Sequence, residues 1–504
     1  MGTGTTRTGT TRARTGTRPG AGAARAARAV APLLLAGSLL GALSGCASGD
    51  GATGAGAAGG ASGGSAAGGG AGEAGGPPPS VKLAAPAAFD TAKGWEVKAG
   101  WLPQGQPLPF AVSPRNGAVA YLDKGPKGYV LTVREAASGR VLATGRPWRG
   151  PELTEEQARE DPTVLAVPRI AVVAGRDRDY FAVWARGRAR KDALHEYREV
   201  VAAAFYPADA TGRDLTPSGA GNAQAPDGEF DRPLVLPGPG GLLVTSYGGD
   251  HLLIAPDGRV TDRGGREVVL NGASAAPDHL QSFQGTEGLV TNGDDVLGHD
   301  GGFGAEGGWQ STRVAPPGVE AVRTEDTVGG GTSKVLNGRI VGAAGGQLLA
   351  EWVTDGDNVS AVHDLATGAV RATAPCPPEE TDYGIGIPSP RNRAEVPPAV
   401  SPDERFFVKA GTVFDLRTGK GTCTDGGADA RKITLATVGD DGIAYGTAGE
   451  EPPLTPVSVS VTTGAVTALP ENAVTPDAMT GRAGVFVTYA GTDTMRLIVL
   501  PLKG

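Results

Sequence analysis

The sequence is poor in the residues that most often build active sites. It has three cysteines and five histidines among 504 residues, and aromatic residues make up 5% of it. The histidines form no HxxxH or HExxH pattern, and the chain has no CxxC, S-x-x-K or P-loop motif. The sequence therefore indicates no local zinc, acyl-transfer or nucleotide site. A catalytic triad assembled from distant residues stays open, because triads are defined by geometry and not by chain order.

Long apolar runs are also missing. The uncharged stretch 29–45 is shorter than the roughly 20 residues that cross a bilayer as a helix, and it contains Pro32, Gly37 and Gly41. Six arginines and no acidic residue precede Cys46. A basic region, a short apolar region and a small-residue end are typical of a cleaved export signal, which we assign to residues 1–45.

Leu43-Ser44-Gly45-Cys46 ends this stretch and resembles the lipobox of bacterial lipoproteins. The resemblance implies that the Cys46 thiol receives a diacylglyceryl group and that cleavage before Cys46 makes it the mature N-terminus. We therefore expect a lipid-anchored protein at the extracytoplasmic face of the cell membrane. The alternative is an ordinary signal peptide with an incidental cysteine.

A linker and an acidic body follow. Residues 47–79 contain 14 glycines and 10 alanines and end in three prolines, so we assign 46–79 to the lipidated cysteine and a disordered tether of roughly 30 Å root-mean-square span. Without the six leader arginines, 40 basic residues face 54 acidic ones, a net charge of −14. This balance argues against nucleic acid as a partner and leaves the lipid as the membrane contact. We expect a monomer.

Residues 80–504 show short β-rich runs broken by Gly, Pro, Asp and Asn, and almost no helical periodicity. A unit recurs that consists of a strand, a glycine turn and a short outer strand, as in "HDLATGAVRAT" and "FDLRTGKGT". Glycine suits these turns because it adopts positive φ without steric cost. The turn glycines are Gly94, Gly139, Gly212, Gly258, Gly368, Gly419 and Gly464.

Their spacing predicts a single all-β propeller, with eight blades favoured and seven next. A gap of 110 residues after Gly258 places one degenerate unit within 270–325, and a gap of 73 after Gly139 contains an insertion around 186–199. The piece 473–504 has inner strands without a turn unit, and 80–104 has a turn unit without inner strands. We expect them to complete one blade together, which leaves no open sheet edge. A β-helix and two separate sandwiches are the less favoured folds.

A second pattern opens some units: "AVSPRNG" from 111, "AVSPDER" from 399 and "AVTPDAM" from 473, each a turn before an inner strand. The repeated units resemble the PQQ-like and WD40/YVTN-type propeller repeats of bacterial envelope proteins. The resemblance implies the fold only. Quinone binders of that family carry adjacent cysteines and tryptophan docking motifs. In this sequence no cysteines are adjacent, and Trp95 after Gly94 is the one tryptophan that follows a turn glycine as in that motif. We expect no cofactor, and we interpret the six tryptophans as packing residues.

Three further constellations have two interpretations each. Cys376 and Cys423 follow turn glycines at similar places in neighbouring units, which predicts a structural disulfide, against two free thiols. Residues 291–308 gather acidic residues that suit either calcium or ordinary β-turns, and turn chemistry is favoured. The basic segment around 186–199 is either an arm for an anionic partner or, as favoured, a solvated edge. The acidic residues are Asp294, Asp295, Asp300 and Glu306, and the basic ones Arg186, Arg188, Arg190 and Lys191.

These observations predict a non-catalytic, lipid-anchored propeller that binds a protein or an envelope component. The alternative is a propeller enzyme or cofactor binder, such as a lyase, a glycan hydrolase or a quinone or sugar dehydrogenase, with its site at the central channel. Because propellers host unrelated functions, the fold alone does not choose between them. No catalytic, metal or cofactor residue is assigned, and the assigned positions are Cys46 for the lipid and Cys376 and Cys423 for the disulfide.

Overall fold

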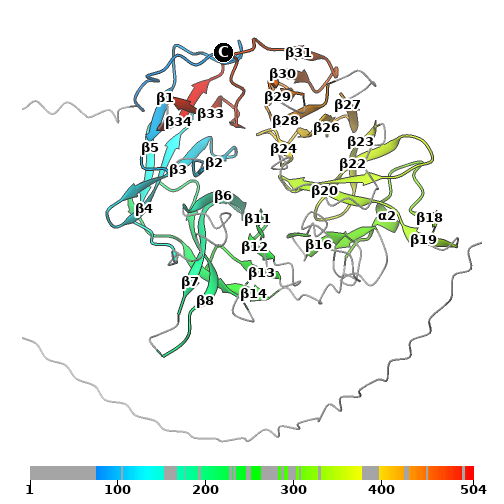
Figure 1. Cartoon of the computed structure of the whole chain (residues 1–504), viewed down its shortest axis with the longest axis horizontal. Helices are drawn as coiled ribbons and strands as arrows, with labels where there is room; N and C mark the ends of the chain where they lie inside the picture. Colours follow the sequence, from blue (N-terminus) through cyan, green and yellow to red (C-terminus); the bar gives the residue numbers. More distant parts are fainter. Residues whose placement is uncertain are drawn as a thin grey trace, which may run out of the picture. The chain divides into compact units, whose positions relative to one another are not determined.

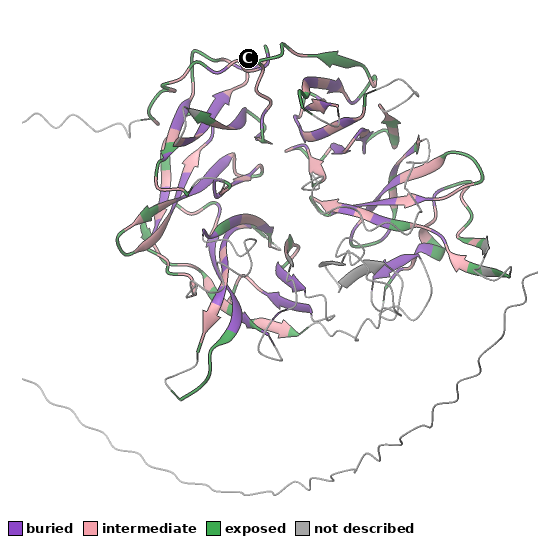
Figure 2. Cartoon of the chain, viewed as in Figure 1, coloured by how far each residue is buried: buried purple, intermediate pink, exposed green. Residues whose placement is uncertain are grey.

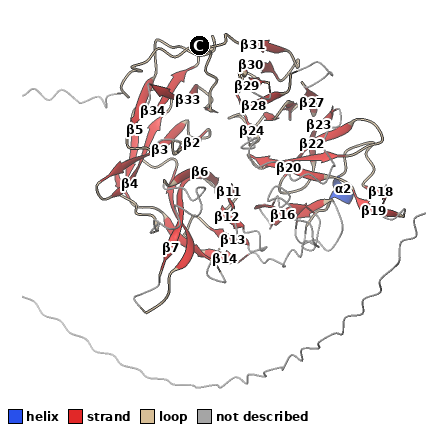
Figure 3. Cartoon of the chain, in the orientation of Figure 1, coloured by secondary structure: helices blue, strands red, loops and turns tan. Residues whose placement is uncertain are grey.

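Strands form nearly all of the regular structure in a computed structural model of the chain (Figures 1 and 3). All the described residues lie in one compact unit, Gly70–Gly504. Among them the only helix is the single turn α2 (Ser311–Val314). The structure describes residues 75–103, 106–151, 167–175, 177–190, 194–225, 230, 234–245, 251–262, 282–284, 289–292, 302–305, 308–326, 331–376, 397–424, 431–449, 452–490 and 494–504.

Antiparallel sheets of consecutive strands follow one another along the chain, as the repeat predicts. The first sheet adds β9 (Gly212–Leu215), which runs parallel to β5. The first three sheets consist of β2 (Phe110–Ser113), β3 (Ala118–Gly125), β4 (Gly128–Glu135) and β5 (Val141–Gly145); of β6 (Arg169–Ala174), β7 (Asp179–Ala189), β8 (Arg198–Pro207) and β10 (Gly219–Gln224); and of β11 (Leu234–Gly238), β12 (Gly241–Thr245), β13 (His251–Ile254) and β14 (Val260–Asp262).

The degenerate unit predicted within 270–325 contains the three-stranded sheet β15 (Ser282–Gln284), β16 (Leu289–Asn292) and β17 (Phe303–Ala305). A separate ribbon, β18 (Val322–Asp326) with β19 (Thr332–Leu336), follows it and was not predicted. The next two blades share one eight-stranded sheet, because their outer strands β23 and β27 pair in parallel at Thr373↔Lys420. Their strands are β20 (Arg339–Ala344), β21 (Gln347–Trp352), β22 (Asn358–Asp364) and β23 (Val370–Cys376), and β24 (Ala399–Val400), β25 (Phe406–Lys409), β26 (Thr412–Asp415) and β27 (Lys420–Cys423). The following sheet consists of β28 (Ile433–Val438), β29 (Ile443–Ala448), β30 (Thr455–Ser460) and β31 (Val466–Ala468).

The two ends of the body share one sheet, which confirms the predicted closure. β32 (Ala478–Met479), β33 (Ala483–Ala490) and β34 (Thr494–Pro501) are joined by β1 (Trp95–Ala99) at the outer edge. β1 pairs with β34 in antiparallel register from Trp95↔Val499 to Ala99↔Met495. The last sheet therefore needs strands from both ends of the body.

The core lies between neighbouring sheets, where buried side chains of adjacent blades meet (Figure 2). The first strands of successive sheets contact one another: β2 with β6, β6 with β11, β11 with β15, β24 with β28 and β28 with β32. The cluster of Trp95, Tyr121 and Val485 packs the last sheet against the first. The sheets thus form a closed ring, and the fold is a β-propeller. The number of blades stays a prediction, since 263–281 and 293–301 lie outside the described residues.

Candidate binding face

The two faces of the ring carry different kinds of connection. Because the strands of a blade alternate in direction, the turns after its first and third strands lie on one face, which we call the turn face. Backbone bonds join these two turns within a blade, from Ala136 N to Gly117 O (2.9 Å) and from Leu365 N to Gly346 O (2.9 Å). The hairpins after the second strands and the connections between blades lie on the other face, which we call the loop face.

The connections on the turn face are mostly short, regular turns. All seven turn glycines taken from the sequence have positive φ, between 71° and 115°, as expected. The strand after Gly212 differs from the prediction: β9 pairs in parallel with β5 of the preceding blade, and the outer strand of its own blade is β10. In four turns the glycine N–H donates to the carbonyl four residues earlier, at 2.8–3.0 Å; these glycines are Gly139, Gly368, Gly419 and Gly464. These repeated turns offer little variety for recognition.

Two tryptophans pack an outer edge against the turn of the next blade. Trp95 Nε1 donates to Ala136 O (2.8 Å), and Trp309 Nε1 donates to Ala366 O (3.1 Å). A Cβ at Gly139 would lie 2.5 Å from Trp95 Cγ, so each indole fills the space that the turn glycine leaves. Both tryptophans are buried packing residues, as expected, although the sequence pattern revealed only Trp95.

The "AVSP" pattern also has a structural role on the turn face. Ser113 Oγ donates to Asp179 Oδ2 of the next blade (2.9 Å), and the Asp403 N–H donates to Asp440 Oδ1 of its next blade (2.8 Å). Burial, followed by repulsion from the Asp403 charge, raises the pKa of Asp440. These carboxylates join neighbouring blades.

The loop face holds the irregular parts of the chain. The β18–β19 ribbon is fixed there by Asn337, a buried residue whose Nδ2 donates to Glu320 O and Val353 O, both at 2.8 Å. Buried Glu199 plays a similar part, because it forms an ion pair with Arg186 and accepts the Phe230 N–H (2.8 Å). The irregular segments of the loop face are thus held by hydrogen bonds and an ion pair of buried side chains.

The predicted insertion around 186–199 is the end of a long β-hairpin. β7 and β8 pair as far as Ala189↔Arg198, whereas β6 begins opposite Trp184 and β10 ends opposite Val200, so the hairpin extends past its sheet (Figures 1 and 2). Of the predicted basic residues, Arg186 is paired within the hairpin and the Arg190 guanidinium lies 5.0 Å from the Tyr197 ring; Lys191 lies outside the described residues.

Most of the large exposed apolar side chains among the described residues lie on the loop face. At the hairpin tip the exposed fraction is 94% for Leu194 and 45% for Tyr197. Other large exposed hydrophobic residues of this face are Val322, Leu454 and Tyr489. The remaining exposed ones among the described residues, Val141 and Val466, begin the outer strands β5 and β31 beside the turn face. Exposed aromatic and apolar groups are typical of protein interfaces.

The inner strands contain few charges. In the described first strands of the blades, the ionisable residues are Arg169 and Arg339, at the starts of β6 and β20. Within the described part of the chain, no three His, Cys, Asp or Glu side chains gather as a metal site would require. The described residues therefore offer cations near the ring axis and nominate no acid–base pair.

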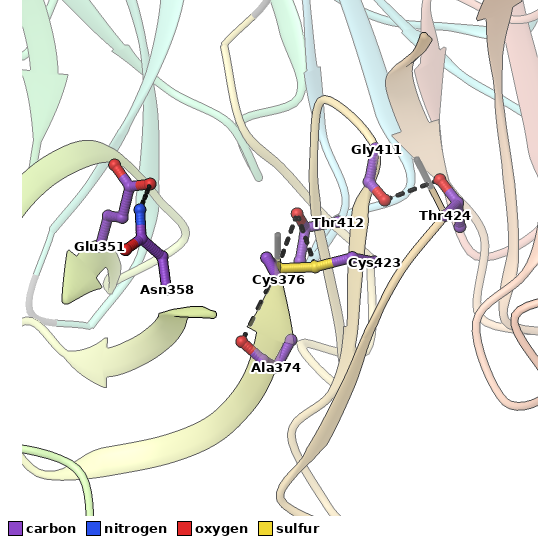
Figure 4. The surroundings of a disulfide bond; sticks show 8 residues. All are labelled: Glu351, Asn358, Ala374, Cys376, Gly411, Thr412, Cys423 and Thr424. Carbon is purple, nitrogen blue, oxygen red and sulfur yellow. Dashed lines mark hydrogen bonds between the residues drawn. A yellow bond between two sulfur atoms is a disulfide. The ribbon is translucent and has the colours of Figure 1, made fainter. Parts of the chain in front are cut away.

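Cys376 and Cys423 form a disulfide, as the sequence predicts, with their Cα atoms 5.5 Å apart (Figure 4). They end β23 and β27, the outer strands of two neighbouring blades, which pair in parallel within one sheet. Thr412 Oγ1 lies 3.9 Å from one sulfur and 3.8 Å from the other. In the chain-entropy model, a bridge of this span stabilises the fold by about 4 kcal/mol.

Two sets of assigned residues lie outside the described part of the chain. These are the leader with Cys46, and the acidic residues Asp294, Asp295, Asp300 and Glu306. Within the described residues, no helix is long and apolar enough to cross a membrane. Residues 75–79, at the end of the predicted tether, pack on the body, where Gly76 N donates to Ser138 O (3.2 Å).

No protein-family model matches the chain, and no curated protein does. Among solved structures, it is similar to the Dos1 propeller, with 9% identity and a TM-score of 0.34 over 81% of this chain and 94% of that one. It is also similar to KlHsv2 with loop 6CD replaced by a Gly-Ser linker, with 9% identity and a TM-score of 0.30 over 72% of this chain and 98% of that one. The propeller assignment rests on the strand order and the closed ring.

Proposed function

We propose that this chain is a non-catalytic, lipid-anchored extracytoplasmic propeller that binds a protein or an envelope component through its loop face. The observation that carries the proposal is the uneven surface: Leu194, Tyr197, Val322, Leu454 and Tyr489 are all exposed on the loop face. A solvent-exposed leucine at a hairpin tip gains free energy when a partner covers it. The turn face, built from repeated glycine turns, serves to hold the blades together.

The lipobox and the tether support the location. The tether reaches the described body at Gly75–Gly76, beside the Gly139 turn on the turn face. A tether that joins this face leaves the loop face uncovered. The lipid on Cys46 is then the membrane contact, and the acidic body stays monomeric and free of nucleic acid.

A propeller enzyme with a site at the ring axis is the competing function. Such a site needs converging acid, base or metal-binding groups. The described inner strands offer Arg169 and Arg339, and no carboxylate or histidine among their residues. No described observation favours the enzyme, so we propose binding.

The test compares matched surface variants of the full chain in detergent-solubilised membranes. Leu194→Thr with Tyr197→Thr removes the hairpin-tip contacts, and Val141→Thr with Val466→Thr removes comparable exposed groups elsewhere. We expect the first pair to weaken capture of the partner by about tenfold or more and the second pair to leave it unchanged. Cys46→Ala should move the protein out of the membrane fraction. Equal capture by both pairs would refute the loop-face assignment, and Cys46→Ala protein that stays in the membrane would refute the anchor.

A further inference from the structure

In three blades a cation followed by isoleucine stands where the inner strand begins; Arg169 and Arg339 are the first residues of β6 and β20, and Lys432 directly precedes β28. The pairs are Arg169-Ile170, Arg339-Ile340 and Lys432-Ile433. Each isoleucine is buried in the cluster shared with the preceding blade. Because side chains alternate across a strand, the cation before it lies on the side of the following blade. The three cations therefore occupy equivalent places.

These places lie on the loop face, since the connection from the previous blade leads into each inner strand there. Arg169 and Arg339 are exposed and Lys432 is half-buried. We call these three residues the basic rim. They come from three blades that are not neighbours in the ring, so their charges are spread around its axis.

Arg169 has the clearest capacity for a ligand. Its guanidinium carbon lies 5.8 Å from the Trp184 ring, and no described carboxylate forms an ion pair with it. Although Arg169 is exposed, partial loss of surrounding water lowers the pKa of its guanidinium. A flat guanidinium supported by an aromatic ring presents its N–H groups to the two oxygens of a phosphate or carboxylate.

The other two cations, Arg339 and Lys432, already interact within the fold. Arg339 Nε and Nη2 donate to Glu351 Oε2, at 2.8 and 2.5 Å, so a ligand would share this cation with Glu351. Next to Lys432, Arg431 Nη1 donates to Thr455 Oγ1 (3.1 Å) and adds a further positive charge. In the last blade the residue before the inner strand β32 is an acid instead of a cation: Asp477, whose carboxylate accepts the Val487 N–H (2.6 Å).

We propose that the basic rim binds an anionic polymer whose phosphate or carboxylate groups contact Arg169, Arg339 and Lys432. A polymer fits because its charges repeat along the chain, as the cations do around the ring axis. In a chain of net charge −8, cations at equivalent places on one face give a local site for an anion. This inference names the ligand class for the loop face and rests on the proposed binding function.

The test measures binding of three labelled polymers to the full chain in detergent: polyphosphate, polyglutamate and neutral dextran. We expect an anionic polymer to bind, more weakly as salt rises, and dextran not to bind. Arg169→Gln with Arg339→Gln and Lys432→Gln should weaken binding by about tenfold or more. The control, Arg178→Gln with Arg259→Gln and Arg482→Gln, removes the same charge from the turn face and should change binding less than about twofold.

Further variants guard against a folding effect of leaving Glu351 unpaired. Arg169→Gln with Lys432→Gln avoids that residue and should still weaken binding, whereas Arg169→Lys should keep more binding than Arg169→Gln. Equal losses in the rim and turn-face triples would overturn the proposal, because total charge would then explain binding. Failure of both anionic polymers to bind would also overturn it, while protein capture through Leu194 and Tyr197 would stand. Preference for polyphosphate or polyglutamate identifies the anionic group.

Discussion

At the scale of single residues, His363 shows how completely the blade core excludes water. Its Nδ1 lies 2.9 Å from Gly368 O, and Trp352 Nε1 donates to its Nε2 (3.3 Å). The ring is fully buried. Desolvation lowers the pKa of His363 to about 4, and the bond to the Gly368 carbonyl opposes this only in part. Both partners require a neutral ring with its proton on Nδ1.

This buried histidine makes the fold sensitive to acid. The unfolded chain binds a proton near pH 6.5 and the folded chain only near pH 4, so the stabilisation is present above pH 6.5 and is lost as the pH falls toward 4. The largest loss is about 3 kcal/mol. We expect urea unfolding between pH 7 and 4.5 to show a steeper fall for the wild type than for His363→Phe.

The control for this prediction is His195→Gln, in the exposed part of the β7–β8 hairpin. It should reproduce the wild-type dependence of unfolding free energy on pH. His363→Phe lowers stability at pH 7 because the Trp352 N–H loses its acceptor, so only the dependence on pH decides. A His363→Phe protein that loses as much stability in acid as the wild type would contradict the assignment.

At the scale of elements, the joint between blades is an outer edge packed on a glycine turn. Trp95 and Gly139 form one such joint, and Trp309 and Gly368 form another. Thr422 of β27 lies in the same way against Gly464, where a Cβ would be 2.9 Å from its Cγ2. The joint thus depends on the missing side chain of the glycine as well as on its positive φ.

Two glycines separate these effects. Gly139 (φ 71°) faces Trp95, whereas a Cβ at Gly117 (φ 55°) would meet nothing within 4 Å. Gly117→Ala should cost about 1–2 kcal/mol for the left-handed backbone alone. Gly139→Ala should cost about 1–3 kcal/mol more, because the added methyl displaces the indole. Urea unfolding of both variants, in wild-type and Trp95→Ala backgrounds, measures the difference. Part of the extra cost should remain without the indole, because the methyl would also lie 2.8 Å from Gly76 N. An equal cost at both sites, or an extra cost that Trp95→Ala does not reduce, would contradict the joint.

The sequence predicted these turns well because positive φ is a local demand that glycine meets locally. It did not predict the joint at Trp309, since the glycine before that tryptophan belongs to no recognised repeat. The β18–β19 ribbon was missed as well, because Asn337 fixes it through the carbonyl groups of Glu320 and Val353, which no local sequence pattern indicates as its partners. The basic rim does correspond to a sequence pattern, a cation followed by isoleucine. This pattern could not be interpreted from the sequence, because only the arrangement of the strands shows that the three cations occupy equivalent places.

At the scale of the whole molecule, segments from both ends of the body close the ring. Phe89 packs with Tyr445 and Phe486, and Trp95 belongs to the cluster that joins the last blade to the first. Glu96 adds polar contacts between the two ends: its carboxylate accepts hydrogen bonds from the Ser80 N–H (2.9 Å) and from Arg496 Nη1 (3.1 Å). An open ring would expose β34 as a sheet edge and uncover two hydrophobic clusters.

Closure therefore predicts how truncation acts. A chain of residues 75–504 keeps these contacts and should unfold in one thermal transition, as the full chain does. A chain of residues 100–504 loses β1 with Phe89 and Trp95, each costing about 3–5 kcal/mol when removed from a core. This loss approaches the stability of a whole domain, about 5–15 kcal/mol, so the cooperative transition should disappear. A synthetic peptide of residues 75–103 should restore it, at a midpoint that rises with peptide concentration, because binding to the folded state alone stabilises that state. If the shorter chain unfolds as the longer one does, β1 is not needed for the ring to close. The blades must then be held together by their inner strands alone.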